Sequence, residues 1–143
     1  AGKHVLCEKP LANTVAEAEA MVAAADAAAA RGVKAMVGFT YRRVPAVQLA
    51  QQLVESGALG EIREGRAVYL QDWLSDPEAP MTWRMDKAAA GSGALGDLGA
   101  HIVDMTQFLT GERVERVAGT TRTFTTERPM LASNVGLSGT AST

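Results

Sequence analysis

The sequence predicts an α/β unit that leads into an α+β region, and three observations support this fold class. Two short apolar runs, at residues 4–7 and 33–39, have the length and composition of buried parallel strands. The alanine-rich segment between them is long enough for a crossover helix. Composition changes near residue 42, where two tryptophans and polar loops follow. We therefore predict the end of a doubly wound domain over residues 1–42 and a partial α+β domain over residues 43–143.

Composition and charge limit the class of protein. The 143 residues are 47% apolar and 21% charged, as in a globular domain that buries about two-thirds of its unfolded surface in a core. A net charge of −2 disfavours nucleic acid and anionic membranes as partners, and no apolar run approaches the roughly 20 residues of a membrane span. Cys7 is the single cysteine, which fits a cytoplasmic protein, and we interpret it as a small buried thiol rather than a nucleophile.

The first helix is predicted from residue 14 to the Arg31-Gly32 pair. Thr14 and Glu17 have capping-box spacing, and Gly32 suits the C-terminal end. Its apolar stripe is mostly small, which suits close packing on a sheet, and consists of Val15, Ala18, Val22, Ala25 and Ala29.

Four further elements are expected after the second strand. Pro45 suits the first turn of a helix that stops before Gly57. Residues rich in β-formers predict strands over 61–72 and 114–125, and a helix is expected over 97–110.

The glycine-rich run from Gly91 to Gly96 formally matches the G-x-G-x-x-G pattern of dinucleotide-binding loops. That loop follows a buried strand, whereas residues 86–90 read Asp-Lys-Ala-Ala-Ala. We therefore reject the dinucleotide interpretation and predict a tight turn that lets the backbone approach another group closely.

A polar stripe follows the glycine turn. Asp97, His101 and Asp104 fall in a narrow wedge of the predicted helix, separate from its apolar face of Leu98, Ile102, Met105 and Leu109. Four interpretations stay open: a proton-transfer site, a capping aspartate with an incidental core histidine, a solvated polar face, and a metal site that lacks a clear further ligand.

Basic residues follow both predicted strands. Lys9 ends the first strand, and a cis bond to Pro10 would aim it rigidly at the ligand crevice. Arg42 and Arg43 leave the second strand at the same edge, where open α/β sheets bind ligands.

In combination these motifs resemble the glucose-fructose oxidoreductase / inositol dehydrogenase (Gfo/Idh/MocA) family. The matching features are Glu8-Lys9-Pro10 after a strand, Gly38-Phe39 followed by Arg42-Arg43, and Asp97-x-x-x-His101 after the glycine run. Their order and approximate spacing match through residue 111, about three-quarters of the chain.

The resemblance implies a Rossmann domain for NAD or NADP, followed by a domain with an open, mainly antiparallel sheet that carries substrate. It implies oxidation or reduction at a secondary alcohol or carbonyl of a sugar or cyclic polyol. His101 would be the general acid/base, Lys9 would contact nicotinamide and substrate, and Asp97 would orient substrate or imidazole. The resemblance further assigns Glu8, Lys9, Pro10 and Arg42 to the cofactor, and Arg43, Trp83, Lys87 and Asp97 to the substrate.

The family's cofactor loop has no counterpart in this sequence, so we interpret the chain as an internal fragment that is inactive alone. A homo-oligomer, dimer or tetramer, is expected of the parent protein. Two other functions stay open: a non-catalytic sugar-nucleotide sensor or binding module, and a metal-dependent sugar isomerase or lyase. The identity of the sugar, and the choice between NAD and NADP, are left open.

Overall fold

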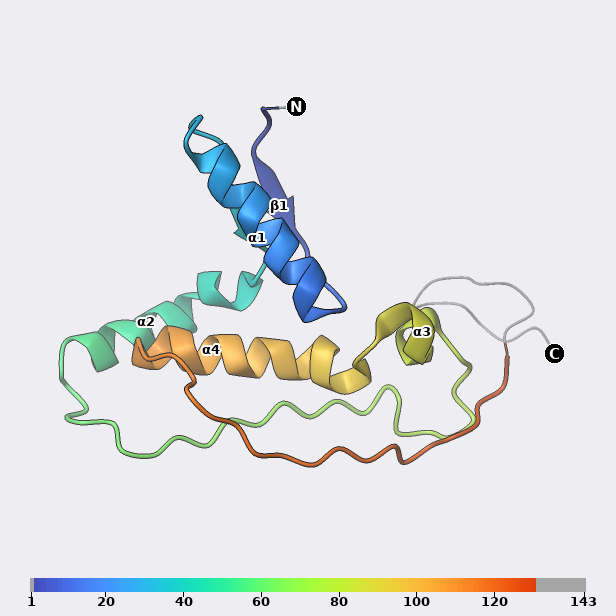
Figure 1. Cartoon of the computed structure of the whole chain (residues 1–143). Helices are drawn as coiled ribbons and strands as arrows, with labels where there is room; N and C mark the ends of the chain where they lie inside the picture. The colour runs from blue at the N-terminus through green and yellow to red at the C-terminus, as the bar shows by residue number, and fades with distance from the viewer. Residues whose placement is uncertain (1, 131–143) are drawn as a thin grey trace.

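The computed structural model describes residues 2–130, which begin with a parallel βαβ unit (Figure 1). Strand β1 (Val5–Cys7) pairs in parallel with β2 (Ala35–Val37), and helix α1 (Val15–Ala29) connects them. Both strands are shorter than the apolar runs that predict them. The expected parallel sheet with its crossover helix is confirmed.

Local signals set the two ends of α1. The Thr14 hydroxyl accepts a hydrogen bond from the Glu17 amide at 3.2 Å, and the Glu17 carboxylate accepts one from the Thr14 amide at 3.0 Å. This is the predicted capping box. The helix ends at Ala29, and Gly32 takes a left-handed φ of +75° in the turn that follows.

Two further helices pack together after the sheet. A 3₁₀ turn, η1 (Thr40–Arg43), leads from β2 into α2 (Pro45–Glu55), which has proline in its first turn as predicted. Helix α4 (Ala100–Thr110) ends at Gly111, whose φ is +73°. Helix α4 packs against α2 and η1, and Figure 1 shows the βαβ unit standing on one side of it.

The glycine-rich turn connects short helices rather than a strand and a helix. Two short turns precede it, η2 (Trp83–Met85) and α3 (Lys87–Ala90), and a π-helical turn, η3 (Leu95–Gly99), runs directly into α4. The absence of a preceding strand supports the rejection of a dinucleotide loop. A side chain at Gly96 would collide with the Ser92 hydroxyl, and its Cβ would lie 3.8 Å from Pro10 Cγ. The glycine turn therefore lies close to the Lys9–Pro10 corner.

The two predicted strands over 61–72 and 114–125 are not formed among the residues that the structure describes. Both segments are extended and run past α4 in Figure 1, but neither takes part in a ladder. Beyond them, the Met81 amide donates to the Pro129 carbonyl at 2.8 Å. The β-forming residues favour an extended backbone, whereas a strand also requires a paired neighbour. The open antiparallel sheet is therefore not confirmed.

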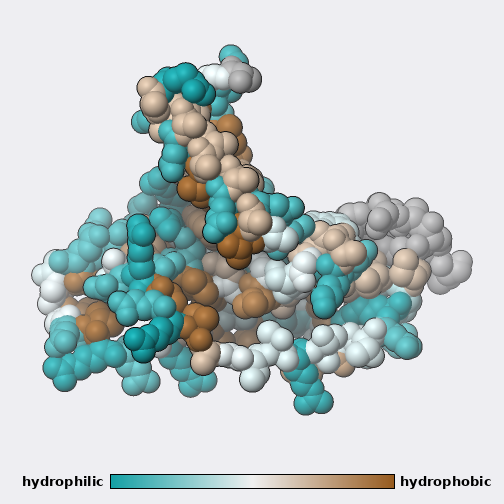
Figure 2. All heavy atoms as spheres, in the orientation of Figure 1, coloured by the Kyte–Doolittle hydropathy of each residue, from teal (hydrophilic) through white to brown (hydrophobic). Residues whose placement is uncertain are grey.

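The expected apolar core is also not found within residues 2–130. No apolar residue there is buried, and Val15 and Val22 of α1 are 75% and 50% exposed. Figure 2 shows apolar side chains at the surface of both the βαβ unit and the lower helices. A two-stranded sheet has too little area to cover a helix face. Cys7 is half-buried rather than buried. No helix in the described part is long and apolar enough to cross a membrane.

Candidate active site

Lys9 and Asp97 meet at the C-terminal edge of the sheet. The Lys9–Pro10 peptide bond is cis, as predicted. The Lys9 ammonium donates to the Asp97 carboxylate at 2.7 Å and to the Asp97 backbone carbonyl at 2.8 Å. The Lys9 side chain is only 15% exposed, so this charge-assisted pair is partly shielded from water. Two of the three predicted catalytic residues, 88 positions apart, are thus in direct contact.

His101 lies in an aromatic cage in the first turn of α4, one helical turn after Asp97. Its imidazole centroid is 4.4 Å from that of Tyr41, and 6.3 Å from those of Phe39 and Tyr69. His101 is 9% exposed, and its Nδ1 is buried without a hydrogen-bond partner among the described residues. A buried unpaired nitrogen costs about 1–3 kcal/mol and therefore requires an explanation, of which a catalytic role is one.

The interpretation of the polar stripe as a solvated face is wrong. His101 and Asp104 are the two buried residues in the part of the chain that the structure describes. The helical pattern places both on one face, but the neighbouring η1 turn and the aromatic cage cover that face rather than water.

Burial lowers the pKa of His101 below its ordinary value of 6.5. The Lys9 charge lowers it further, and the carboxylates of Asp97, Asp104 and Glu8 oppose the shift. The imidazole is therefore neutral at pH 7 and free to accept a proton.

Asp104 holds Arg42 by two parallel hydrogen bonds. The Arg42 Nε and Nη2 atoms donate to the two carboxylate oxygens at 2.9 and 2.5 Å, and this raises the pKa of Arg42. The guanidinium also lies over the rings of Phe39 and Phe108, at 5.9 and 5.3 Å from their centroids. These hydrogen bonds join Arg42 of η1 to α4, on the helix face that carries His101 and Asp104.

The three candidate metal ligands do not form a metal site. Asp97 is paired with Lys9, and Asp104 is paired with Arg42. Within residues 2–130 no group of three or more histidine, cysteine or carboxylate side chains is arranged to hold a metal ion.

Replacing Asp104 with asparagine is expected to lower the free energy of unfolding by about 1–3 kcal/mol, because the Arg42 cation loses its partner beside a buried site. Denaturant unfolding of the variant measures this loss. Glu61→Gln is the matched control, since the Glu61–Arg63 pair is 76% and 82% exposed and such pairs contribute about 0–1 kcal/mol. Equal losses in the two variants would contradict a stabilising role for the buried pair.

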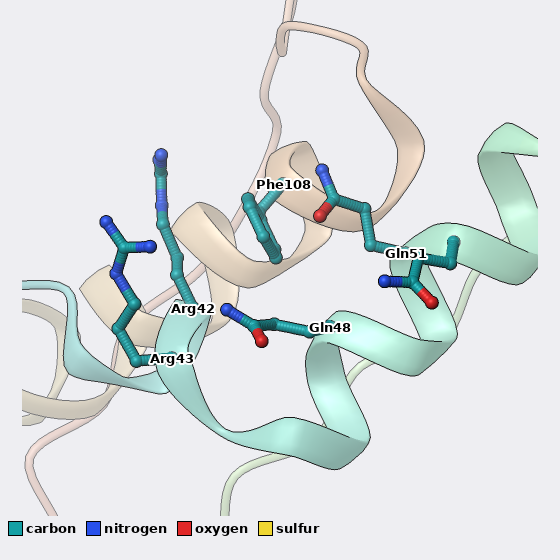
Figure 3. Close-up of a pocket in the computed structure, with 6 residues that line it drawn as sticks. Arg42, Arg43, Gln48, Gln51 and Phe108 are labelled. Carbon is teal, nitrogen blue, oxygen red and sulfur yellow. The ribbon is translucent and has the colours of Figure 1, made fainter.

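The remaining predicted substrate residues, Arg43, Trp83 and Lys87, lie in three other elements. Arg43 lines a hollow of about 370 Å³ beside Arg42 (Figure 3), together with Gln48, Gln51, Gln52 and Phe108. Trp83 lies in η2, 49% exposed and stacked under Arg84 at 4.3 Å, and Lys87 begins α3. No hydrogen bond or ion pair within the described residues joins Arg43, Trp83 or Lys87 to His101. Their roles stay predictions.

Sequence reasoning missed Tyr41 and Tyr69. Their hydroxyls lie 2.6 Å apart, and this hydrogen bond raises the pKa of Tyr41. The position of Tyr41, just after a strand at the ligand-binding edge, was an available signal. Nothing local marks Tyr69, because its partner lies 28 residues away.

Comparison with known proteins gives two family matches. The model described as "GFO/IDH/MocA C-terminal domain" matches residues 47–142. The model described as "Oxidoreductase family, NAD-binding Rossmann fold" matches residues 1–39.

Individual relatives agree with these matches. The chain is 46% identical over 140 residues to a levoglucosan dehydrogenase of Pseudarthrobacter phenanthrenivorans, covering 98% of this chain and 35% of that protein. The crystal structure of an oxidoreductase domain protein from Kribbella flavida is 68% identical, with a TM-score of 0.87 over 89% of this chain and 34% of that one. A levoglucosan dehydrogenase in complex with NADH and levoglucosan is 45% identical, with a TM-score of 0.75 over 90% and 34% of the two chains. The chain spans about a third of the length of the curated relatives it matches.

Proposed function

Because the chain belongs to the Gfo/Idh/MocA oxidoreductase family, we propose that it supplies the acid/base helix of an NAD(P)-dependent dehydrogenase. The substrate class is a secondary alcohol or carbonyl of a sugar or cyclic polyol. One observation carries this proposal: the buried imidazole of His101, with an unpaired nitrogen, beside the Lys9–Asp97 pair. The names of the relatives, several of which are sugar dehydrogenases, support the same class of reaction.

The residues present fit the nicotinamide end of the cofactor. Strands β1 and β2 end at the same edge, and Lys9 lies there against η3. A Cβ at Gly38 would lie 3.3 Å from the Cys7 carbonyl, so glycine keeps the backbone open at this edge. We assign Glu8, Lys9, Pro10 and Arg42 to the cofactor. When bound, NAD(P) would accept or return the hydride.

In this proposal, proton transfer and the stabilisation of charge depend on His101, Lys9 and Asp97. His101 accepts the proton of the substrate hydroxyl at a ring nitrogen, for which its lowered pKa keeps it neutral. The Lys9 ammonium favours the negative charge that develops on the substrate oxygen. Asp97 holds that ammonium in place through two contacts, and in this proposal it orients the substrate through Lys9. Arg43, Trp83 and Lys87 are our candidates for the substrate wall.

A metal-dependent isomerase would require Asp97 and Asp104 as ligands, and both are already paired with cations. A sensor would not need a neutral buried imidazole beside a lysine. The discriminating experiment follows nicotinamide reduction by the full-length protein with uncharged sugars and polyols, before and after treatment with a chelator. We expect turnover that the chelator does not change. Loss of turnover on chelation, or none with any sugar, would sink the proposal. We further propose that the full-length protein is cytoplasmic and that it is homo-oligomeric. Measurement of its molecular mass in solution tests the second of these proposals.

The 143-residue chain alone is expected not to bind NADH or NADPH at micromolar concentration. The reason is that phosphate binding needs a glycine-rich loop between a strand and a helix, and the one glycine-rich run here lies on the substrate side. Titration by nicotinamide fluorescence measures this, with the full-length protein as the positive control. Saturable micromolar binding by the 143 residues would contradict the expectation.

A further inference from the structure

We propose that Tyr41 is a positioning residue whose ring, held in place by the hydroxyl of Tyr69, fixes the imidazole of His101 for proton transfer. This inference rests on the proposed acid/base role of His101. It concerns a pair of side chains that the catalytic assignment above does not use.

The first step is the absence of a polar tether on the imidazole. Acid/base histidines are commonly oriented by a hydrogen bond to the second ring nitrogen. In His101 the Nδ1 atom makes no such bond within residues 2–130, and the Asp97 carboxylate bonds to Lys9 instead. The orientation of the ring must therefore come from packing.

The second step is that Tyr41 supplies this packing. Its ring centroid is 4.4 Å from the imidazole centroid, with 31° between the ring planes, which is the range of a tilted stack. Phe39 and Tyr69 lie farther away, at 6.3 Å. Tyr41 is thus the closest aromatic wall of the His101 cage.

The third step is that Tyr41 is itself held at its hydroxyl. Its hydroxyl is hydrogen-bonded to that of Tyr69 at 2.6 Å, and Gln71 donates to the Tyr69 hydroxyl at 3.0 Å. Tyr41 belongs to η1 and Tyr69 to the extended segment 61–72, so this hydrogen bond joins two remote parts of the chain against α4. A ring held at its hydroxyl cannot swing away from the imidazole without breaking that bond.

The ring also keeps water from the imidazole, and burial is the main cause of the lowered His101 pKa. The titratable groups that face His101 from the surrounding elements are Lys9, Asp97, Asp104, Glu8, Tyr41 and Tyr69. Removing the Tyr41 ring leaves the charged residues of this set unchanged and lets water reach the imidazole. The His101 pKa should then rise towards 6.5.

The test compares Tyr41→Leu with Tyr41→Phe in the full-length protein. Tyr41→Leu removes the stacked ring and is expected to lower kcat about 10- to 100-fold, the order of loss from a misplaced catalytic group, while KM changes much less. Tyr41→Phe keeps the ring but removes its hydrogen bond to Tyr69, so kcat should fall a few-fold and lie between the values of the wild type and Tyr41→Leu. The His101 pKa, followed by NMR on the signal that His101→Asn removes, should rise in Tyr41→Leu and return towards the wild-type value in Tyr41→Phe.

Phe124→Leu is the matched control, an aromatic-to-leucine change at a ring that is 88% exposed, and it should alter neither quantity. A Tyr41→Leu protein with wild-type kcat and wild-type His101 pKa overturns the proposal. So does a Tyr41→Phe protein as impaired as Tyr41→Leu. If Tyr41→Leu does not fold, Tyr69→Phe decides, since unchanged kcat and pKa there would also overturn it. An inactive wild-type protein refutes the proposed function instead, whereas the NMR titration still tests the positioning.

Discussion

Replacing His101 with asparagine is expected to lower turnover about 10²–10⁴-fold, because general acid–base catalysis contributes that much and an amide cannot accept the proton. Asparagine is smaller than histidine, so it fits the space next to the Tyr41 ring without a clash. The affinity for NAD(P) should change little, because we assign the cofactor to residues at the end of β1 and to Arg42. Steady-state kinetics and a cofactor titration of the full-length protein measure the two quantities.

The pH dependence gives a second reading of the same substitution. In the proposed reaction the neutral imidazole is the active form for alcohol oxidation, and burial lowers its pKa below 6.5. Activity of the wild type should therefore be full at neutral pH and fall only at pH values near and below the His101 pKa. This acid limb of the pH profile should vanish in His101→Asn. His4→Asn is the matched control, since His4 lies before β1 and bonds the Lys34 amide. Unchanged turnover in His101→Asn would remove His101 from its role.

The elements that could be predicted from the sequence are those determined by local signals. The capping box at Thr14 and Glu17, the proline that opens α2 and the glycine that ends α4 act within one helical turn. The apolar runs before and after α1 likewise predicted the parallel pair, since a short crossover leaves few topologies.

The parts that could not be predicted depend on what packs against each element. A helical pattern places His101 and Asp104 on one face but does not tell whether protein or water covers that face. The Arg42–Asp104 pair spans 62 residues, so the sequence offered Arg42 and Arg43 as equal candidates. The segment 61–72 has strand-forming residues, yet pairing depends on a neighbouring backbone that its own sequence does not specify.

Replacing Lys9 with methionine is expected to lower kcat about 10²–10³-fold, the loss measured when one donor to a developing oxyanion is removed. Methionine keeps most of the length of the side chain and removes its charge. The change should also raise the pKa of His101, because the Lys9 ammonium is one of the two causes that lower it. The acid limb of the pH profile should then move to higher pH, the direction that loss of a nearby cation dictates.

The size of the loss in kcat separates two roles for Lys9. If the ammonium only anchors Asp97 in η3, then Lys9→Met should reduce thermal stability and leave kcat near the wild-type value, although the acid limb still moves because the charge is lost. If the Lys9 ammonium acts on the reacting centre, Lys9→Arg should have a kcat between those of Lys9→Met and the wild type. Arginine restores the positive charge, but its planar guanidinium is larger than the compact ammonium. Lys34→Met, at an exposed lysine before β2, controls for the loss of one positive charge and should leave kcat and the acid limb unchanged. A Lys9→Met protein with normal kcat and reduced thermal stability would show that the Lys9–Asp97 contact serves structure alone.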